Sequence, residues 1–136
     1  MDTRRFGRPA LALAAVAIMT ACGGGNSSPS SPSPVSGSPG PSGATITIGT
    51  NGAVSPAQVT VTVGQSVTFV NNDARAHDMS SDPHPIHTDC PEINAVSTLG
   101  PGQTRSTNAF PAPRTCGYHD HTNPNNTSLQ GRIVIQ

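Results

Sequence analysis

The chain has 136 residues, with 14 glycines, 14 prolines, no tryptophan and a formal net charge of zero at pH 7. It contains no lysine, so it lacks the basic surface that nucleic acids require, and we expect no nucleic-acid partner. Only 3% of its residues are aromatic. A folded core must therefore be built mainly from valine and isoleucine.

Residues 1–21 are typical of a bacterial export signal. Three arginines precede a short apolar run at residues 10–19, which is too short to cross a bilayer as a helix. The run ends in Met19-Thr-Ala-Cys22, which resembles the lipobox of bacterial lipoproteins, although leucine usually stands where Met19 does. We expect removal of residues 1–21 and lipidation of Cys22, which would anchor an exported protein to a membrane facing the periplasm or cell surface. Ordinary signal cleavage without a lipid is the alternative.

Residues 22–43 consist almost entirely of glycine, serine and proline. Such a segment has too little apolar surface to offset the entropy of ordering it, so it predicts a flexible tether. Residues 44–136 remain, which is enough chain for one small domain and too little for two.

The domain alternates apolar and polar residues with a period of two. The clearest runs are residues 45–48 (TITI), 58–63 (QVTVTV), 66–70 (SVTFV) and 131–135 (GRIVI). Alternating β-branched runs bounded by glycine predict half-buried strands, and hence an all-β sandwich or barrel. Residues 71–97 are polar and rich in proline and histidine. We expect a long loop there with at most one short helical turn, and loops of that length are usually functional.

Both halves of the domain resemble plastocyanin-like cupredoxins. The first half, residues 54–73, has the pattern of a strand, a glycine turn, a second strand and then Asn71-Asn-Asp73, and His77 follows shortly after. The second half of the family pattern is matched at residues 99–103, at Phe110 and at residues 115–120. The resemblance implies a Greek-key β-sandwich that binds copper, with His77 at the position of the first histidine ligand. It also implies copper handling or electron transfer with a redox or copper-transfer protein as partner.

The chain departs from the family at the copper ligands. A type 1 copper site uses two histidines, a cysteine thiolate and usually a weak axial methionine. The family motif is Tyr-His-Cys-x-x-His, whereas this chain has Tyr118-His119-Asp120 followed by Asn123, and no methionine after Met79. Asp120 therefore stands at the thiolate position and Asn123 at the second histidine position. The resemblance thus predicts an atypical copper site.

Two interpretations of the remaining cysteines stay open. If Cys22 carries a lipid, Cys90 and Cys116 are the remaining pair, and a pair in an oxidising compartment favours a disulfide. Closing a loop of about 26 residues would stabilise the fold by about 3 kcal/mol in the chain-entropy model. Alternatively, Cys116-Gly-Tyr-His119 aligns as Cys-x-x-His, which would make Cys116 a thiolate ligand beside His77 and His119.

All five histidines lie between positions 77 and 121. His119 and His121 are two residues apart and so share one face of an extended strand. Imidazole is a common copper ligand, so we predict a copper site of His77, His119 and His121 completed by Asp120 or by a loop histidine. If the strand continues unbroken, Asp120 faces away from His119 and can join them only where the chain turns. The loop adds two further candidates, His84 and His87.

Two other classes of function compete with copper binding. A degenerate cupredoxin scaffold without metal would act as a binding module, with its histidines solvated or hydrogen-bonded to carboxylates. An enzyme is less favoured: residues 117–121 (GYHDH) resemble a strand of copper–zinc superoxide dismutases, but the domain is too short for that family. Four loop aspartates, at 73, 78, 82 and 89, lack the spacing of a calcium loop.

Overall fold

The structure is a computed structural model that describes residues 41–136. The predicted signal at 1–21, the lipidation site Cys22 and all but the last residues of the tether lie outside this range. The first strand, β1 (Ser42–Ile48), begins two residues before the predicted start of the domain. Within residues 41–136 there is no helix of the length and apolarity needed to cross a membrane.

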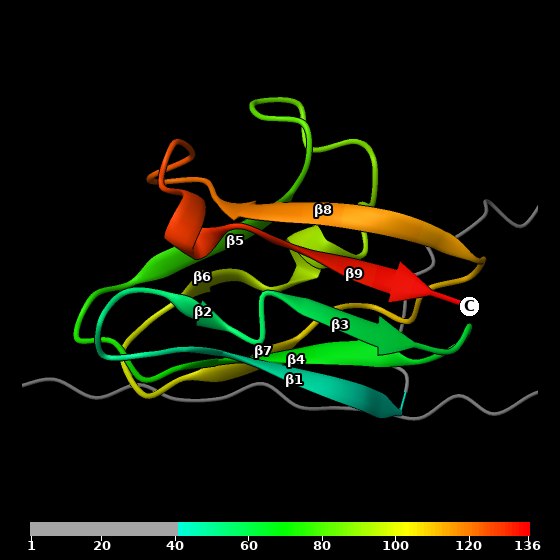
Figure 1. The fold of residues 1–136 in the computed structure, drawn as a ribbon, viewed down its shortest axis with the longest axis horizontal. Coiled ribbons are helices and arrows are strands. Elements are labelled where there is room, and N and C mark those ends of the chain that lie inside the picture. The colour runs from blue at the N-terminus through cyan, green and yellow to red at the C-terminus, as the bar shows by residue number, and fades with distance from the viewer. Residues whose placement is uncertain (1–40) are drawn as a thin grey trace, which may run out of the picture. The chain divides into compact units, whose positions relative to one another are not determined.

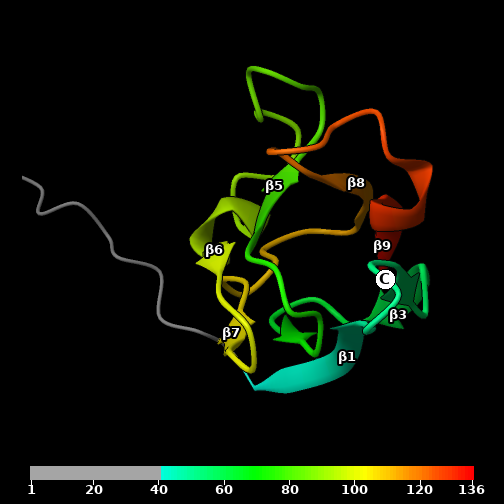
Figure 2. The same cartoon turned by 90° about the vertical axis from the view of Figure 1, so that its left-hand side faces the viewer.

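The described residues form two β-sheets that face each other (Figures 1 and 2). One sheet has the order β2-β1-β4-β7 and the other the order β3-β9-β8-β5-β6. The strands of the first sheet, besides β1, are β2 (Val54–Ser55), β4 (Ser66–Asn71) and β7 (Thr104–Ser106). Those of the second are β3 (Gln58–Val61), β5 (His77–Ser81), β6 (Ser97–Leu99), β8 (Arg114–Asp120) and β9 (Gly131–Ile135). This architecture confirms the predicted all-β sandwich.

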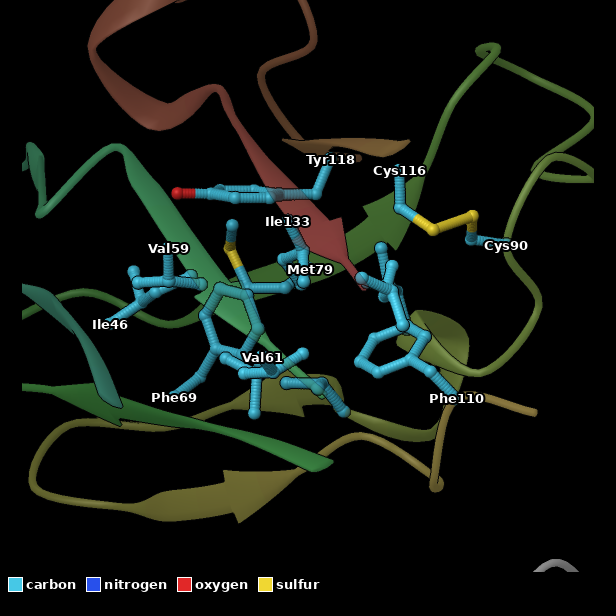
Figure 3. Packing of buried hydrophobic residues seen from close by; sticks show 14 of the residues in the cluster. Ile46, Val59, Val61, Phe69, Met79, Cys90, Phe110, Cys116, Tyr118 and Ile133 are labelled. Carbon is cyan, nitrogen blue, oxygen red and sulfur yellow. A yellow bond between two sulfur atoms is a disulfide. The ribbon is translucent and has the colours of Figure 1, made fainter. Parts of the chain in front are cut away.

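Alternation along the strands builds the core between the sheets. In β3, Val59 and Val61 are buried while the residues between and before them are exposed, and β9 buries Ile133 and Ile135 in the same way. The Phe69 ring of one sheet packs edge-on against Tyr118 of the other, with 5.3 Å between centroids (Figure 3). Burial of apolar surface on the inner faces is what holds the two sheets together.

The predicted loop at residues 71–97 is wrong in its middle, because residues 77–81 form β5 between β8 and β6. The segment His-Asp-Met-Ser-Ser has no apolar alternation, so pattern alone gives no strand signal. The His77 ring bonds to two carboxylates and the Ser81 amide donates to Asn94, contacts that only the tertiary structure supplies. The predicted short helical turn exists as η1 (Ile93–Ala95), and a second one, η2 (Thr127–Leu129), precedes β9.

A disulfide joins Cys90 to Cys116, with 5.8 Å between their Cα atoms (Figure 3). Both cysteines are buried. The bond confirms the predicted pairing and excludes Cys116 as a free thiolate ligand. It also attaches the far end of the loop that follows β5 to the centre of β8.

Candidate metal centre

Four histidines converge on the outer side of the five-stranded sheet. His119 and His121 come from the end of β8, and His84 and His87 come from the loop after β5, which projects beyond β8 (green, top of Figure 1). One ring nitrogen of each lies within 4.8 Å of those of the others. The strand pleat correctly predicted that His119 and His121 lie together. We call these four residues the histidine cluster.

The loop that carries His84 and His87 is closed by its own hydrogen bonds. The His87 amide donates to the Pro83 carbonyl at 2.8 Å, and the Asp89 amide donates to the Asp82 carbonyl at 3.0 Å. The Asn94 amide group donates to the His87 carbonyl at 3.0 Å. These bonds hold His87 at a φ of 52°, in the left-handed region that non-glycine residues rarely adopt. The position of the His87 ring is therefore set by the loop backbone.

His87 is held in its neutral form at neutral pH because its pKa is lowered. Burial, followed by the neighbouring His121, His119 and His84, lowers the pKa of His87 below its ordinary value of 6.5. Partial desolvation and like charges both disfavour the imidazolium form. His87 Nε2 and His121 Nδ1 lie 3.1 Å apart, so in the metal-free protein one ring donates to the other. Neutral imidazoles are the form that binds a metal ion.

Of the four histidines, His119 most clearly has a ring nitrogen available to bind a metal ion. Its side chain is 3% exposed, and its Nδ1 lies 2.7 Å from Asp82 Oδ1. Its Nε2 is buried without a hydrogen-bond partner among the described residues. A buried polar atom without a partner is costly and calls for an explanation such as an ion. The donor set thus fits a nitrogen-binding cation such as Cu²⁺ or Zn²⁺.

The structure places His77 and Asp120 together but outside the histidine cluster. His77 Nδ1 lies 2.9 Å from Asp120 Oδ2, and His77 Nε2 lies 3.0 Å from Asp73 Oδ2. His77 is on the same side of β5 as the core residue Met79, whereas Ser80 pairs with His119. Because the pleat continues to the end of β8, Asp120 faces the opposite way from His119. Both nitrogens of His77 are thus occupied by carboxylates.

These carboxylates are stabilised in their ionised form. Burial raises the pKa of Asp120, but hydrogen bonds from His77, the Asp78 amide and Thr122 outweigh it, so the pKa is lowered. Burial likewise raises the pKa of Asp73, and bonds from His77, the Ala74 amide and Arg75 lower it overall. An ionised carboxylate only accepts hydrogen bonds. Both ring nitrogens of His77 therefore face hydrogen-bond acceptors.

A cavity of about 90 Å³ lies where the resemblance to cupredoxins places copper. Its lining includes His77, Asp120, Asn123 and Leu129. Within it there is no thiolate, and the only imidazole is already bonded to two carboxylates. The chemistry of this cavity does not fit type 1 copper.

The sequence predicted His84 and His87 only as further candidates, and it gave Asp82 no part in the metal site, since the loop aspartates lack the spacing of a calcium loop. The spacing His-Pro-Ile-His, bracketed by Asp82 and Cys90, is the signal that distinguishes this loop. The distance between that loop and β8 is set by the disulfide and by strand pairing.

Comparison with known proteins agrees with this architecture. No protein-family model matches the chain, and no curated protein does. Among solved structures, a purple cupredoxin from Nitrosopumilus maritimus is 20% identical, with a TM-score of 0.53 over 68% of this chain and 99% of its own. Auracyanin from Roseiflexus castenholzii is 23% identical, with a TM-score of 0.52 over 71% and 99%. Plastocyanin from Dryopteris crassirhizoma is 18% identical, with a TM-score of 0.52 over 68% and 99%.

The described domain therefore has the cupredoxin fold. Sequence identities this low support a shared fold only, so the chemistry of the site is inferred from this chain's own residues.

Proposed function

We propose that this domain binds copper through the imidazoles of His84, His87, His119 and His121. The observation that carries the proposal is the convergence of four ring nitrogens within 4.8 Å. Among the divalent first-row metals, nitrogen donors bind Cu²⁺ most tightly. A further structural neighbour, a mutant of amicyanin that is 20% identical with a TM-score of 0.53, is described as its Cu(I) form, which supports the same metal. Bound copper would present a redox-active, Lewis-acidic ion near the surface.

The proposed role is copper handling: the domain would carry copper and pass it to a protein partner. Fast electron transfer of the blue-copper kind depends on a cysteine thiolate, and Cys116 is in a disulfide. His84 is exposed, while His87 and His121 are half-buried, so copper there would be accessible for exchange. The proposed setting is outside the cytoplasm, because buried structural disulfides belong to oxidising compartments. Attachment to a membrane through a lipid on Cys22 is part of this proposal.

A copper titration of the purified protein tests the proposal. We expect one Cu²⁺ per chain, a weak visible band and a paramagnetic resonance spectrum of nitrogen coordination. His119→Gln and His84→Gln should each weaken binding at least tenfold, whereas His77→Gln, the matched control outside the cluster, should not. An intense blue band would show a thiolate ligand and overturn the histidine site. No binding at micromolar copper would favour the alternative of a metal-free binding module.

A further inference from the structure

One carboxylate outside the histidine cluster is directed at its most buried member. Asp82 follows β5 directly and begins the loop that carries His84 and His87. Its Oδ1 lies 2.7 Å from His119 Nδ1. Its side chain is 46% exposed, while that of His119 is almost fully buried. A half-exposed carboxylate is thus held against a buried imidazole.

The direction of this hydrogen bond determines which nitrogen of His119 can bind a metal. A carboxylate accepts and does not donate, so Nδ1 must carry the hydrogen. In a neutral ring the lone pair is then on Nε2. Nε2 is the buried atom that has no partner among the described residues. The contact with Asp82 thus presents the correct atom of His119 to an incoming ion.

The backbone around Asp82 is arranged to keep the carboxylate in place. The Asp82 amide donates to the Gly117 carbonyl at 3.1 Å, and the Asp82 carbonyl accepts from the Asp89 amide at 3.0 Å. Gly117 lies two residues before His119 on the same face of β8. A Cβ atom at position 117 would overlap Asp82 Oδ2. Glycine there leaves the space that the carboxylate occupies.

We propose that Asp82 is a positioning residue for the metal centre: its carboxylate fixes the tautomer and orientation of His119 in a carboxylate–histidine–metal arrangement. Gly117 leaves the space that this carboxylate occupies. The inference rests on the proposed function, since it concerns the same site. Partners of this kind orient metal-binding histidines and raise their basicity, and their loss typically costs 10–100-fold in affinity.

Nitrogen-15 spectra of the histidine rings in the purified, metal-free protein test the arrangement without any metal. In the wild type, His119 should show hydrogen on Nδ1 and a bare Nε2. In Asp82→Ala the signal should become a tautomer mixture, and Asp82→Asn, which keeps a neutral acceptor, should restore most of it. An unchanged His119 tautomer in Asp82→Ala would overturn the proposal. This result is independent of whether the protein binds copper.

Titrations with Cu²⁺ and Zn²⁺ provide the second test. Asp82→Ala should weaken binding 10–100-fold and Asp82→Asn less. Gly117→Ala should weaken it similarly, with little added effect when combined with Asp82→Ala, since both remove the same contact. Asp89→Ala is the matched control: it removes one negative charge from an exposed position in the same loop and should change affinity less than threefold. Equal losses in Asp82→Ala and Asp89→Ala would show only a charge effect and overturn the positioning role. If the wild type binds neither metal, the proposed function fails, and the tautomer measurement alone decides the role of Asp82.

Discussion

Replacing Asp120 by asparagine should destabilise the fold strongly while leaving copper binding intact. Asp120 is 2% exposed and accepts hydrogen bonds from His77 at 2.9 Å, from the Asp78 amide at 3.1 Å, and from the amide and hydroxyl of Thr122 at 3.0 and 2.8 Å. The substitution removes a charged acceptor and places an NH₂ group among donors. Leaving a buried donor without its acceptor costs about 1–3 kcal/mol, and more where the lost acceptor is charged. We expect a loss of that size in the free energy of unfolding.

Urea denaturation of the metal-free protein measures this loss, and copper titration of the folded variant measures the second part. Asp89→Asn is the control, because it removes the same charge from an exposed loop position and should change stability by less than about 0.5 kcal/mol. A loss below about 1 kcal/mol would mean that the buried network is not formed as described. Loss of copper binding by the folded Asp120→Asn protein would instead make Asp120 a ligand, and the assignment to the histidine cluster would be refuted.

Three further predictions concern stability. The double variant Cys90→Ser, Cys116→Ser releases a loop closed across 26 residues, so chemical denaturation should show a loss of about 3–4 kcal/mol in the free energy of unfolding; an unchanged midpoint would contradict this. Acidification should destabilise the metal-free protein in two stages, because His87, Asp73 and Asp120 all have folded pKa values below their ordinary ones. The stability they contribute is complete above pH 6.5 for His87 and above pH 3.8 for the aspartates, and it is lost as the pH falls through each folded pKa. Urea melts from pH 8 to pH 3 should show both stages, with the first reduced in His87→Asn. If the wild type instead gains stability relative to His87→Asn as the pH is lowered from 8 to 5, the sign of the His87 effect is wrong. Gly131→Ala should cost about 1–3 kcal/mol by overpacking, because its Cβ would overlap the Ala57 carbonyl and the Tyr118 hydroxyl; a melting temperature equal to the wild type would refute that crowding.

The sandwich was predictable because its signals are local. Residues 58–61 and 131–135 alternate valine or isoleucine with polar residues, and burial of one face follows directly from the pleat. The same period placed His119 and His121 on one face and directed Asp120 to the other. The cysteine pair was predictable from the expected export and the number of cysteines left after the expected lipidation.

The metal centre was only partly predictable, because its parts come together through long-range contacts. The sequence placed His77 with His119 by resemblance, but the direction of β5 puts His77 on the inner side, where Asp73 and Asp120 contact both of its ring nitrogens. β5 itself was missed, because its residues are polar and are stabilised by carboxylates and cross-strand bonds instead of an apolar pattern.

By itself, the sequence determined that the domain is all-β and which face of its alternating strands is buried. It also determined that all five histidines lie between residues 77 and 121. Only the tertiary structure decided which histidines meet. The pairing of β8 with β5, the disulfide to Cys90 and the closed loop at residues 82–89 bring His84 and His87 to His119 and His121. The physical reason is that residue type and pleat specify the face on which a side chain lies, whereas the distance between side chains from different segments depends on how the whole chain packs.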